Sequence, residues 1–356
     1  MSETSAPVID CDGHLVESIP ELAEFMDPSI RKMATNSGRN RNGVFPTLDG
    51  IHYPREREDA PAREYVQASE HRKGSGEDIL AFLERVGVQD SILFTSEGLS
   101  VGFIQQADYA VKLCRAYNDY VAERFRGVSE RLHPMALIPM QRIEDAVAEL
   151  RRAVRELGLP GAMLPSLGLP LHLGHDYYWP VYHEAADLGC ALGIHGGSSI
   201  GFGADSFTDA WAARTIRHPM PLLLAMSSML HHGVLDRFPD FRIGFFEGGA
   251  AWPALLLDRM ERDDAVYVSG GSGSRSLRDY FSSGQVLIGC EGNEDILSYL
   301  SQRVGIEAFA WASDYPHEVD VVAAAEMIAE SMERPDLTSD EKEAVLGGNA
   351  RRFFRL

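Results

Sequence analysis

The sequence predicts an α/β protein of the (β/α)8 TIM-barrel class, and three observations lead to this prediction. Eight short apolar runs of strand length are separated by segments of helical periodicity, and such alternation predicts a parallel sheet. Eight strand–helix units can close a barrel, and Gly-rich or polar connections follow several of the strands. A length of 356 residues is ordinary for one barrel with added loops. We therefore expect a single domain that spans residues 1–356.

The elements follow one another in a regular order along the chain. Strands are predicted where an apolar run is bounded by turn residues: 8–14, 91–95, 133–140, 162–165, 191–195, 241–247, 285–290 and 308–313. Helices are predicted where apolar residues recur at helical spacing between the strands. They are 18–27, 78–86, 104–125, 143–157, 178–188, 220–230, 252–262 and 296–304, with two closing helices on either side of Pro335.

Two predicted loops are long enough to have a function of their own. Residues 34–76 lack periodicity and are rich in Gly, Asn, Arg and Pro, which predicts an insertion after the first strand. Residues 196–211 are rich in Gly and Ser and follow the fifth strand. Long loops of this kind are often lids, so we expect both to cover the barrel mouth and select substrate. The Gly-Ser stretch 269–274 has no G-x-G-x-x-G spacing, which favours a surface loop.

Composition excludes several classes of partner. The chain carries 53 acidic and 33 basic residues, a net charge of −20, which disfavours nucleic acid and anionic membranes. No apolar run approaches the ~18 residues of a membrane span, and the first residues lack the features of a signal peptide. The cysteines are widely spaced and form no C-x-x-C pair: Cys11, Cys114, Cys190 and Cys290. We expect a cytoplasmic protein with a small-molecule substrate, compatible with a homo-oligomer.

Polar side chains fall at the ends of several predicted strands. Asp12 and His14 share one face at the end of the first strand, His195 ends the fifth, Glu247 ends the sixth and Asp314 follows the eighth. The carboxyl ends of barrel strands meet at one mouth. Taken singly, these residues also fit turn caps, core hydrogen bonds or an arginine pair. Together they favour a metal centre, because carboxylates at strand ends are costly without a cation.

Three further residues are candidates for substrate binding. His317 follows Pro316 shortly after the eighth strand. Glu291 follows the seventh strand, where a carboxylate could enter the site. His232 follows a helix-like apolar stretch, and a solvated helix end is the competing interpretation for it.

Five motifs resemble those of a known family. They are IDCDGH at 9–14, GVLDRFP at 233–239, EGG at 247–249, SDYPH at 313–317 and GNARRF at 348–353. This set resembles the amidohydrolase superfamily, in the branch of aminocarboxymuconate-semialdehyde decarboxylase and the resorcylate decarboxylases. The resemblance implies a barrel with one or two divalent metals at the strand ends. It also implies that Asp12, His14, His195 and Asp314 are metal ligands.

The chain departs from this family at two positions of the site. Family decarboxylases usually have His or Glu at the position of Asp12, and commonly have a catalytic His at the position of Glu247. The resulting set of three carboxylates and two imidazoles suits one or two ions of iron, zinc or manganese. Glu247 is therefore expected to bind metal directly, with Asp314 and His195 as further catalytic residues.

A metal-bound water that loses its proton near neutral pH is a nucleophile. We therefore expect a metal-dependent hydrolase of an acyl bond (amide, ester or thioester) in a small organic acid derivative. The alternative is a metal-dependent, non-oxidative decarboxylase of an aromatic or unsaturated carboxylic acid. A barrel that binds a ligand without chemistry is the third class.

Overall fold

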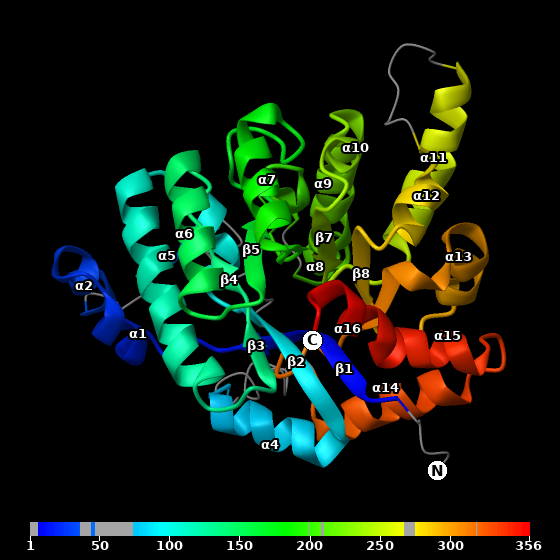
Figure 1. Cartoon of the computed structure of the whole chain (residues 1–356), viewed down its shortest axis with the longest axis horizontal. Helices are drawn as coiled ribbons and strands as arrows, with labels where there is room; N and C mark the ends of the chain where they lie inside the picture. The colour runs from blue at the N-terminus through cyan, green and yellow to red at the C-terminus, as the bar shows by residue number, and fades with distance from the viewer. Residues whose placement is uncertain are drawn as a thin grey trace.

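The strands of the described residues form the eight positions of a barrel (Figure 1). The computed structural model describes residues 6–35, 44–46, 74–198, 200–207, 210–266, 275–317 and 319–356. The third position consists of two short pieces, β3 and β4, separated by Met135. The strands are β1 (Val8–Leu15), β2 (Val88–Thr95), β3 (Leu132–Pro134), β4 (Ala136–Leu137), β5 (Gly161–Pro165), β6 (Ala191–His195), β7 (Arg242–Phe246), β8 (Val286–Cys290) and β9 (Phe309–Trp311).

Neighbouring strands pair in parallel throughout the barrel. One paired run has the order β1-β2-β3 and the other runs from β4 to β9 in sequence order. At the seam, Asp314 N donates to Asp12 O over 2.8 Å and His14 N donates to Tyr315 O over 2.7 Å. These bonds hold the segment after β9 beside β1. The prediction of an α/β barrel is confirmed.

Helices connect successive strands, and several loops carry extra ones. They are α1 (Ile19–Phe25), α2 (Pro28–Thr35), α4 (Gly76–Val86), α5 (Ala107–Val121), α6 (Ile143–Arg155), α7 (Trp179–Leu188), α8 (Ala210–Arg217), α9 (Pro219–His231), α10 (Val234–Arg237), α11 (Trp252–Val266), α12 (Leu277–Ser282), α13 (Ile296–Val304), α14 (Val321–Glu333), α15 (Ser339–Glu343) and α16 (Asn349–Phe354).

Helix α4 shows how local sequence sets an element. Ser75 precedes it and its Oγ accepts a hydrogen bond from Asp78 N over 3.2 Å, which satisfies one of the first free N–H groups. Gly87 ends the helix with φ of 82°, a left-handed conformation that costs glycine little. One face is buried at helical spacing and is formed by Ile79, Phe82 and Leu83.

Several predicted boundaries differ from the structure for identifiable reasons. The predicted strand 133–140 is shorter and interrupted, because Pro134 and Pro139 have no N–H to donate to a ladder. The predicted helix 104–125 is α5, preceded by a 3-10 turn at Gly98–Phe103 and followed by a π turn at Ala122–Arg126. The predicted loop 196–211 leads into α8, and three helices rather than two close the chain.

Most of the predicted insertion at 34–76 lies outside the described residues, as does the predicted surface loop 269–274. Within the insertion, Val44 and Phe45 are buried. Tyr109 Oη donates to Val44 O over 2.7 Å, so residues 44–46 lie against α5.

Aromatic rings fill the barrel interior below the strand ends. The rings of Phe94 and Phe246 have centroids 4.7 Å apart, and both side chains are buried. Neighbouring strands make room for them with glycine. A Cβ at Gly193 would lie 2.9 Å from both rings, and one at Gly289 would lie 3.1 Å from Phe246. The core therefore supports the mouth of the barrel directly from below.

The C-terminal segment closes the opposite, amino-terminal end of the strands. Asn349 is buried and its Nδ2 donates to Ile306 O and Phe309 O, at the start of β9. A Cβ at Gly347 would lie 2.1 Å from Pro7 O, which places this segment against the start of β1. Within the described part of the chain, no helix has the length and apolar character needed to cross a membrane.

Candidate metal centre at the strand ends

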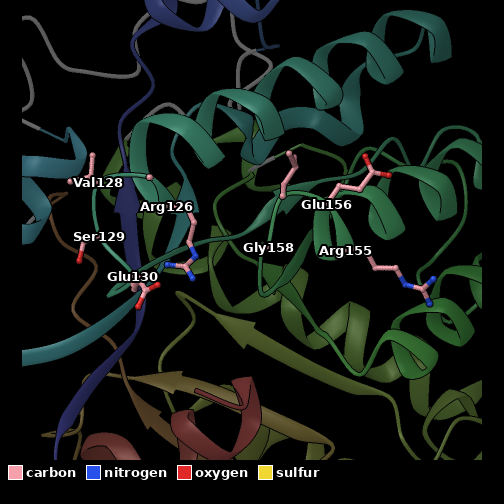
Figure 2. Close-up of a pocket in the computed structure, with 9 residues that line it drawn as sticks. Arg126, Val128, Ser129, Glu130, Arg155, Glu156 and Gly158 are labelled. Atoms are coloured by element: carbon pink, nitrogen blue, oxygen red, sulfur yellow. The ribbon is translucent and has the colours of Figure 1, made fainter.

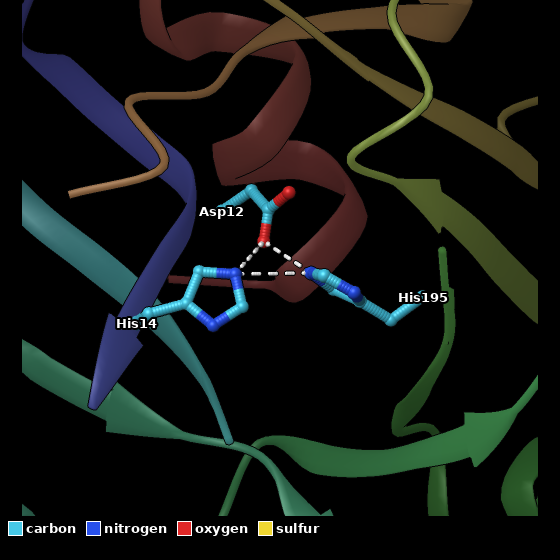
Figure 3. Close-up of side chains that lie close together, drawn as sticks. All are labelled: Asp12, His14 and His195. Atoms are coloured by element: carbon cyan, nitrogen blue, oxygen red, sulfur yellow. Dashed lines mark hydrogen bonds and ion pairs between the residues drawn. The ribbon is translucent and has the colours of Figure 1, made fainter. Parts of the chain in front are cut away.

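Three predicted ligands converge at the carboxyl ends of β1 and β6 (Figure 3). His14 Nε2 lies 3.1 Å from His195 Nε2 and 3.7 Å from Asp12 Oδ1, and His195 Nε2 lies 3.3 Å from the same oxygen. Their ligand atoms all lie within 4.8 Å of one another, and the three side chains are buried. Ligands ~2.1 Å from one ion at right angles are about 3 Å apart. This donor set fits one divalent cation.

Main-chain carbonyls fix the orientation of both imidazoles. His14 Nδ1 donates to Thr95 O over 3.2 Å, and His195 Nδ1 donates to Gly196 O over 2.9 Å. Because a carbonyl can only accept, each ring carries a hydrogen on Nδ1 and directs Nε2 into the cluster. His14 Nε2 then has a lone pair, whereas His195 Nε2, 3.3 Å from Asp12 Oδ1, carries a second hydrogen that a metal ion would replace. Histidine ligands of metals are commonly oriented in this way.

The charges around the cluster move the pKa values of the two imidazoles in opposite directions. Burial lowers the pKa of His14 well below its usual range, and the neighbouring imidazoles add to this effect. Burial also disfavours the charged form of His195. The Asp12 carboxylate and Glu247 outweigh that cost and raise the pKa of His195 to about 9. The site thus attracts positive charge.

Asp314 and His317 extend the cluster from the segment after β9. Asp314 Oδ1 lies 3.5 Å from His14 Nε2, and the rings of His14 and His317 meet edge to face with centroids 4.3 Å apart. His14, Asp314 and His317 form a second group of mutually close ligand atoms. The backbone of Asp314 has φ of 55°, a left-handed conformation that is strained for a residue with a side chain.

Glu247 lies beside this cluster and faces two imidazoles. Glu247 Oε2 is 3.4 Å from His195 Nδ1 and Oε1 is 3.1 Å from His218 Nδ1. Within the described residues, Glu247 belongs to neither group of mutually close ligand atoms. Burial alone would raise its pKa, but His218, His195 and His14 hold the pKa of Glu247 well below its usual range. Its φ of 57° is also left-handed.

His218 is a residue of the site that the sequence did not reveal. It precedes Pro219 at the start of α9, away from the strand ends where the side chains of a barrel site are expected. Arg217 Nε donates to His218 Nε2 over 3.0 Å, so the ring carries its own hydrogen on Nδ1, opposite Glu247. A histidine before a helix that begins with proline was the only available signal.

Asp10 lies on β1 two residues before Asp12 and supports the cluster from below. Its carboxylate accepts hydrogen bonds from Asp12 N, from Ser91 Oγ and from both N and Oγ of Ser313. Burial raises the pKa of Asp10 to about 6 despite these bonds. Asp10 thereby joins β1 to β2 and to the residues that precede Asp314.

The other two candidates for substrate contacts have different positions. Glu291 is exposed, and its main-chain N–H donates to Glu294 Oε1 over 3.1 Å. His232 is exposed at the far end of α9, and its Nδ1 donates to Ser228 O over 2.9 Å. A helix of 13 residues separates it from His218 by ~20 Å at 1.5 Å per residue. His232 therefore lies at an exposed helix end away from His218, as the competing interpretation had it.

A separate hollow lies at the opposite end of the strands. It has a volume of about 610 Å³ and is lined by residues 126–130 and 155–158 (Figure 2). These two loops precede β3 and β5. Barrel enzymes place their chemistry at the carboxyl ends of strands, so this hollow is not part of the candidate site.

The comparison with known families decides the affiliation of the chain. A family model described as amidohydrolase matches residues 9–356. The chain belongs to the amidohydrolase family. The resemblance expected from the five motifs is confirmed.

Several relatives of this chain are decarboxylases. It is 28% identical over 260 residues to 2-amino-3-carboxymuconate-6-semialdehyde decarboxylase of Dictyostelium discoideum, covering 72% of this chain and 70% of the relative. It is 22% identical over 292 residues to gamma-resorcylate decarboxylase of a Polaromonas species, covering 77% and 85%. The prediction that the main activity is acyl-bond hydrolysis, including thioester hydrolysis, is wrong in view of these relatives, which favour the decarboxylase alternative.

The fold of this chain is also similar to that of a solved structure. The structure of 5-carboxyvanillate decarboxylase from Novosphingobium aromaticivorans, which has bound manganese, superposes with a TM-score of 0.73 at 19% identity. The superposition covers 100% of this chain and 99% of the other. The manganese is bound by that neighbour, and it is one of the metals expected from the sequence of this chain (iron, zinc or manganese).

Proposed function

We propose that this member of the amidohydrolase family is a metal-dependent, non-oxidative decarboxylase of an aromatic or unsaturated carboxylic acid. The observation that carries the proposal is the convergence of Asp12, His14 and His195, with the Nε2 atoms of both imidazoles directed to one point. The named activities of the relatives support the same reaction class.

Asp12, His14 and His195 would hold one divalent ion, of which manganese is our first choice, and Asp314 would complete the set. A single ion is favoured because the two groups of close ligand atoms share His14, which has only Nε2 available. When bound, the ion supplies positive charge that orients substrate oxygens and stabilises negative charge that develops on them.

Decarboxylation breaks the bond between the substrate carbon and its carboxylate. A proton adds to the carbon that bears the carboxylate, the C–C bond then breaks, and its electron pair returns to the conjugated system as carbon dioxide leaves. A hydroxylated aromatic or conjugated unsaturated acid suits this reaction because its oxygen can donate electron density to that carbon while the proton adds.

The chain offers Glu247 and His218 as the proton-carrying pair. His218 bears a hydrogen on Nδ1, 3.1 Å from Glu247 Oε1, and Arg217 holds the opposite side of the ring. We assign to this pair the proton transfer that the family performs with a histidine at the position of Glu247.

The decisive experiment measures carbon dioxide release in deuterium oxide from manganese-loaded protein. The substrates are a panel of ortho-hydroxybenzoates and conjugated unsaturated diacids. We expect one acid to yield carbon dioxide and to gain one deuterium on the carbon that bore the carboxylate. His195→Ala is the control and should release none. Release of an alcohol, amine or thiol from ester, amide or thioester analogues, without carbon dioxide from any acid, would overturn the proposal.

A further inference from the structure

A buried carboxylate outside the cluster organises the turn that supports it. Glu17 lies three residues after His14 and is 6% exposed. Its oxygens accept hydrogen bonds from three successive main-chain N–H groups, those of Ser96 (3.2 Å), Glu97 (3.1 Å) and Gly98 (3.2 Å). The hydroxyl of Thr95 donates to the same carboxylate.

These partners identify the protonation state of Glu17 without reference to the metal. Within the described residues, every hydrogen-bond partner of the Glu17 carboxylate is a donor group. Thr95 Oγ1 also accepts from Gly98 N over 2.7 Å, so its only hydrogen goes to Glu17. Burial raises the pKa of Glu17, and these hydrogen bonds oppose that rise. Four donors and no acceptor specify a carboxylate anion.

The turn that Glu17 holds contacts two histidines of the site. Thr95 O accepts from His14 Nδ1, which leaves Nε2 for the cluster. Ser96 Oγ donates its single hydrogen to Leu15 O over 2.8 Å and must therefore accept from His317 Nε2, 3.0 Å away. His317 thus carries its hydrogen on Nε2 and keeps the lone pair on Nδ1.

We propose that Glu17 is a positioning residue of the metal site, because its carboxylate holds the 95–98 turn in the conformation that fixes the tautomers of His14 and His317. This inference rests on the proposed function only in assigning the two histidines to a metal site. Glu17 itself contacts neither histidine and acts through Thr95 and Ser96. A neutral glutamine would supply one acceptor oxygen and would turn an N–H₂ group toward main-chain donors.

The first test reads the tautomers directly in metal-free, full-length protein. Histidine labelled with nitrogen-15 reports which ring nitrogen bears hydrogen. In Glu17→Gln we expect the ring signals of His14 and His317 to shift toward mixed tautomers. The matched control is Glu149→Gln, which removes another buried carboxylate, bound to Asn118 and Arg152, and should leave both rings unchanged.

The second test measures manganese affinity by calorimetry. Loss of an outer partner of a metal ligand typically weakens metal binding ~10–100-fold, and we expect a loss in that range for Glu17→Gln but none for Glu149→Gln. Unchanged ring signals in Glu17→Gln, with a fall in melting temperature like that of the control, would overturn the inference. Failure of the wild-type protein to bind manganese would instead refute the proposed function, and the ring signals would still decide the role of Glu17.

Thr95→Val provides a second variant if Glu17→Gln does not fold. It removes one hydrogen bond to the same carboxylate and keeps the charge. We expect a smaller shift of the His14 and His317 signals in the same direction, and no shift would contradict the inference.

Discussion

His14 Nε2 and His195 Nε2 lie 3.1 Å apart, although each ring already donates its Nδ1 hydrogen to a main-chain carbonyl. Two imidazole lone pairs at this distance would repel each other, so either a proton on His195 Nε2 or a metal ion must lie between the rings. The raised pKa of His195, about 9, fits the proton when no metal is bound. The arrangement of the strands therefore favours positive charge between the two imidazoles, which either a proton or a metal ion can supply.

Replacing either histidine should abolish metal binding. We expect His14→Ala and His195→Ala to lose bound manganese after dialysis, a larger effect than the ~10–100-fold weakening caused by loss of an outer partner. Elemental analysis provides the measurement. His133→Ala is the control, because His133 pairs with Asp90 over 2.9 Å. Full metal content in either cluster variant would contradict the ligand assignment.

Glu247 and His218 should behave as one unit in catalysis. Because general acid–base groups typically contribute ~10²–10⁴-fold to a rate, we expect Glu247→Gln to lower kcat by at least ~100-fold with unchanged manganese content. His218→Asn should do the same, and the double variant should be little worse than either single one. Additive losses, or loss of manganese in Glu247→Gln, would show that Glu247 acts as a ligand instead.

The barrel interior should not tolerate an added methyl group at Gly193. A Cβ there would lie 2.9 Å from the rings of Phe94 and Phe246, and overpacking of a core typically costs ~1–3 kcal/mol. We expect Gly193→Ala to lower the free energy of unfolding by about this amount in urea titrations. Adding Phe94→Leu should recover part of the loss, and a purely additive double variant would argue against the steric cause.

The cysteines should be chemically inert in the native protein. All four are buried, and burial raises the pKa of the Cys190 thiol to about 12. Only the thiolate reacts quickly, so at neutral pH we expect negligible labelling by a disulfide reagent before unfolding. Four thiols per chain should react in denaturant. Rapid labelling of the native protein would show that a thiol is exposed by local opening.

The sequence was sufficient to predict the barrel and the convergence of the candidate ligands on its strands. Asp12, His14 and His195 lie at positions where the two-residue period of a strand and the common mouth of a barrel determine their direction. His218 obeys neither rule, because its position depends on the path of the segment between β6 and α9. His232 was weighed between a substrate contact and a solvated helix end, and the length of α9 carries it away from His218.

The surroundings of Glu247 could not be predicted from a local pattern. A carboxylate at a strand end can bind metal or face an imidazole, and only the folded chain brings Glu247 Oε1 to 3.1 Å from His218 Nδ1. The prolines at 134 and 139 show a similar limit, since apolar residues extend through 133–140 although the hydrogen-bonded ladder does not.

Glu247 and Asp314 adopt left-handed backbone conformations that lower the stability of the fold, while their side chains lie in the candidate site. Left-handed non-glycine residues cost about 1–3 kcal/mol each, and glycine would adopt φ of 57° or 55° without that cost. Laboratory evolution for survival at high temperature alone would therefore tend to replace these two side chains. A selection scheme that preserves the enzyme must include turnover at every round, and gains in stability should come from residues remote from the mouth of the barrel.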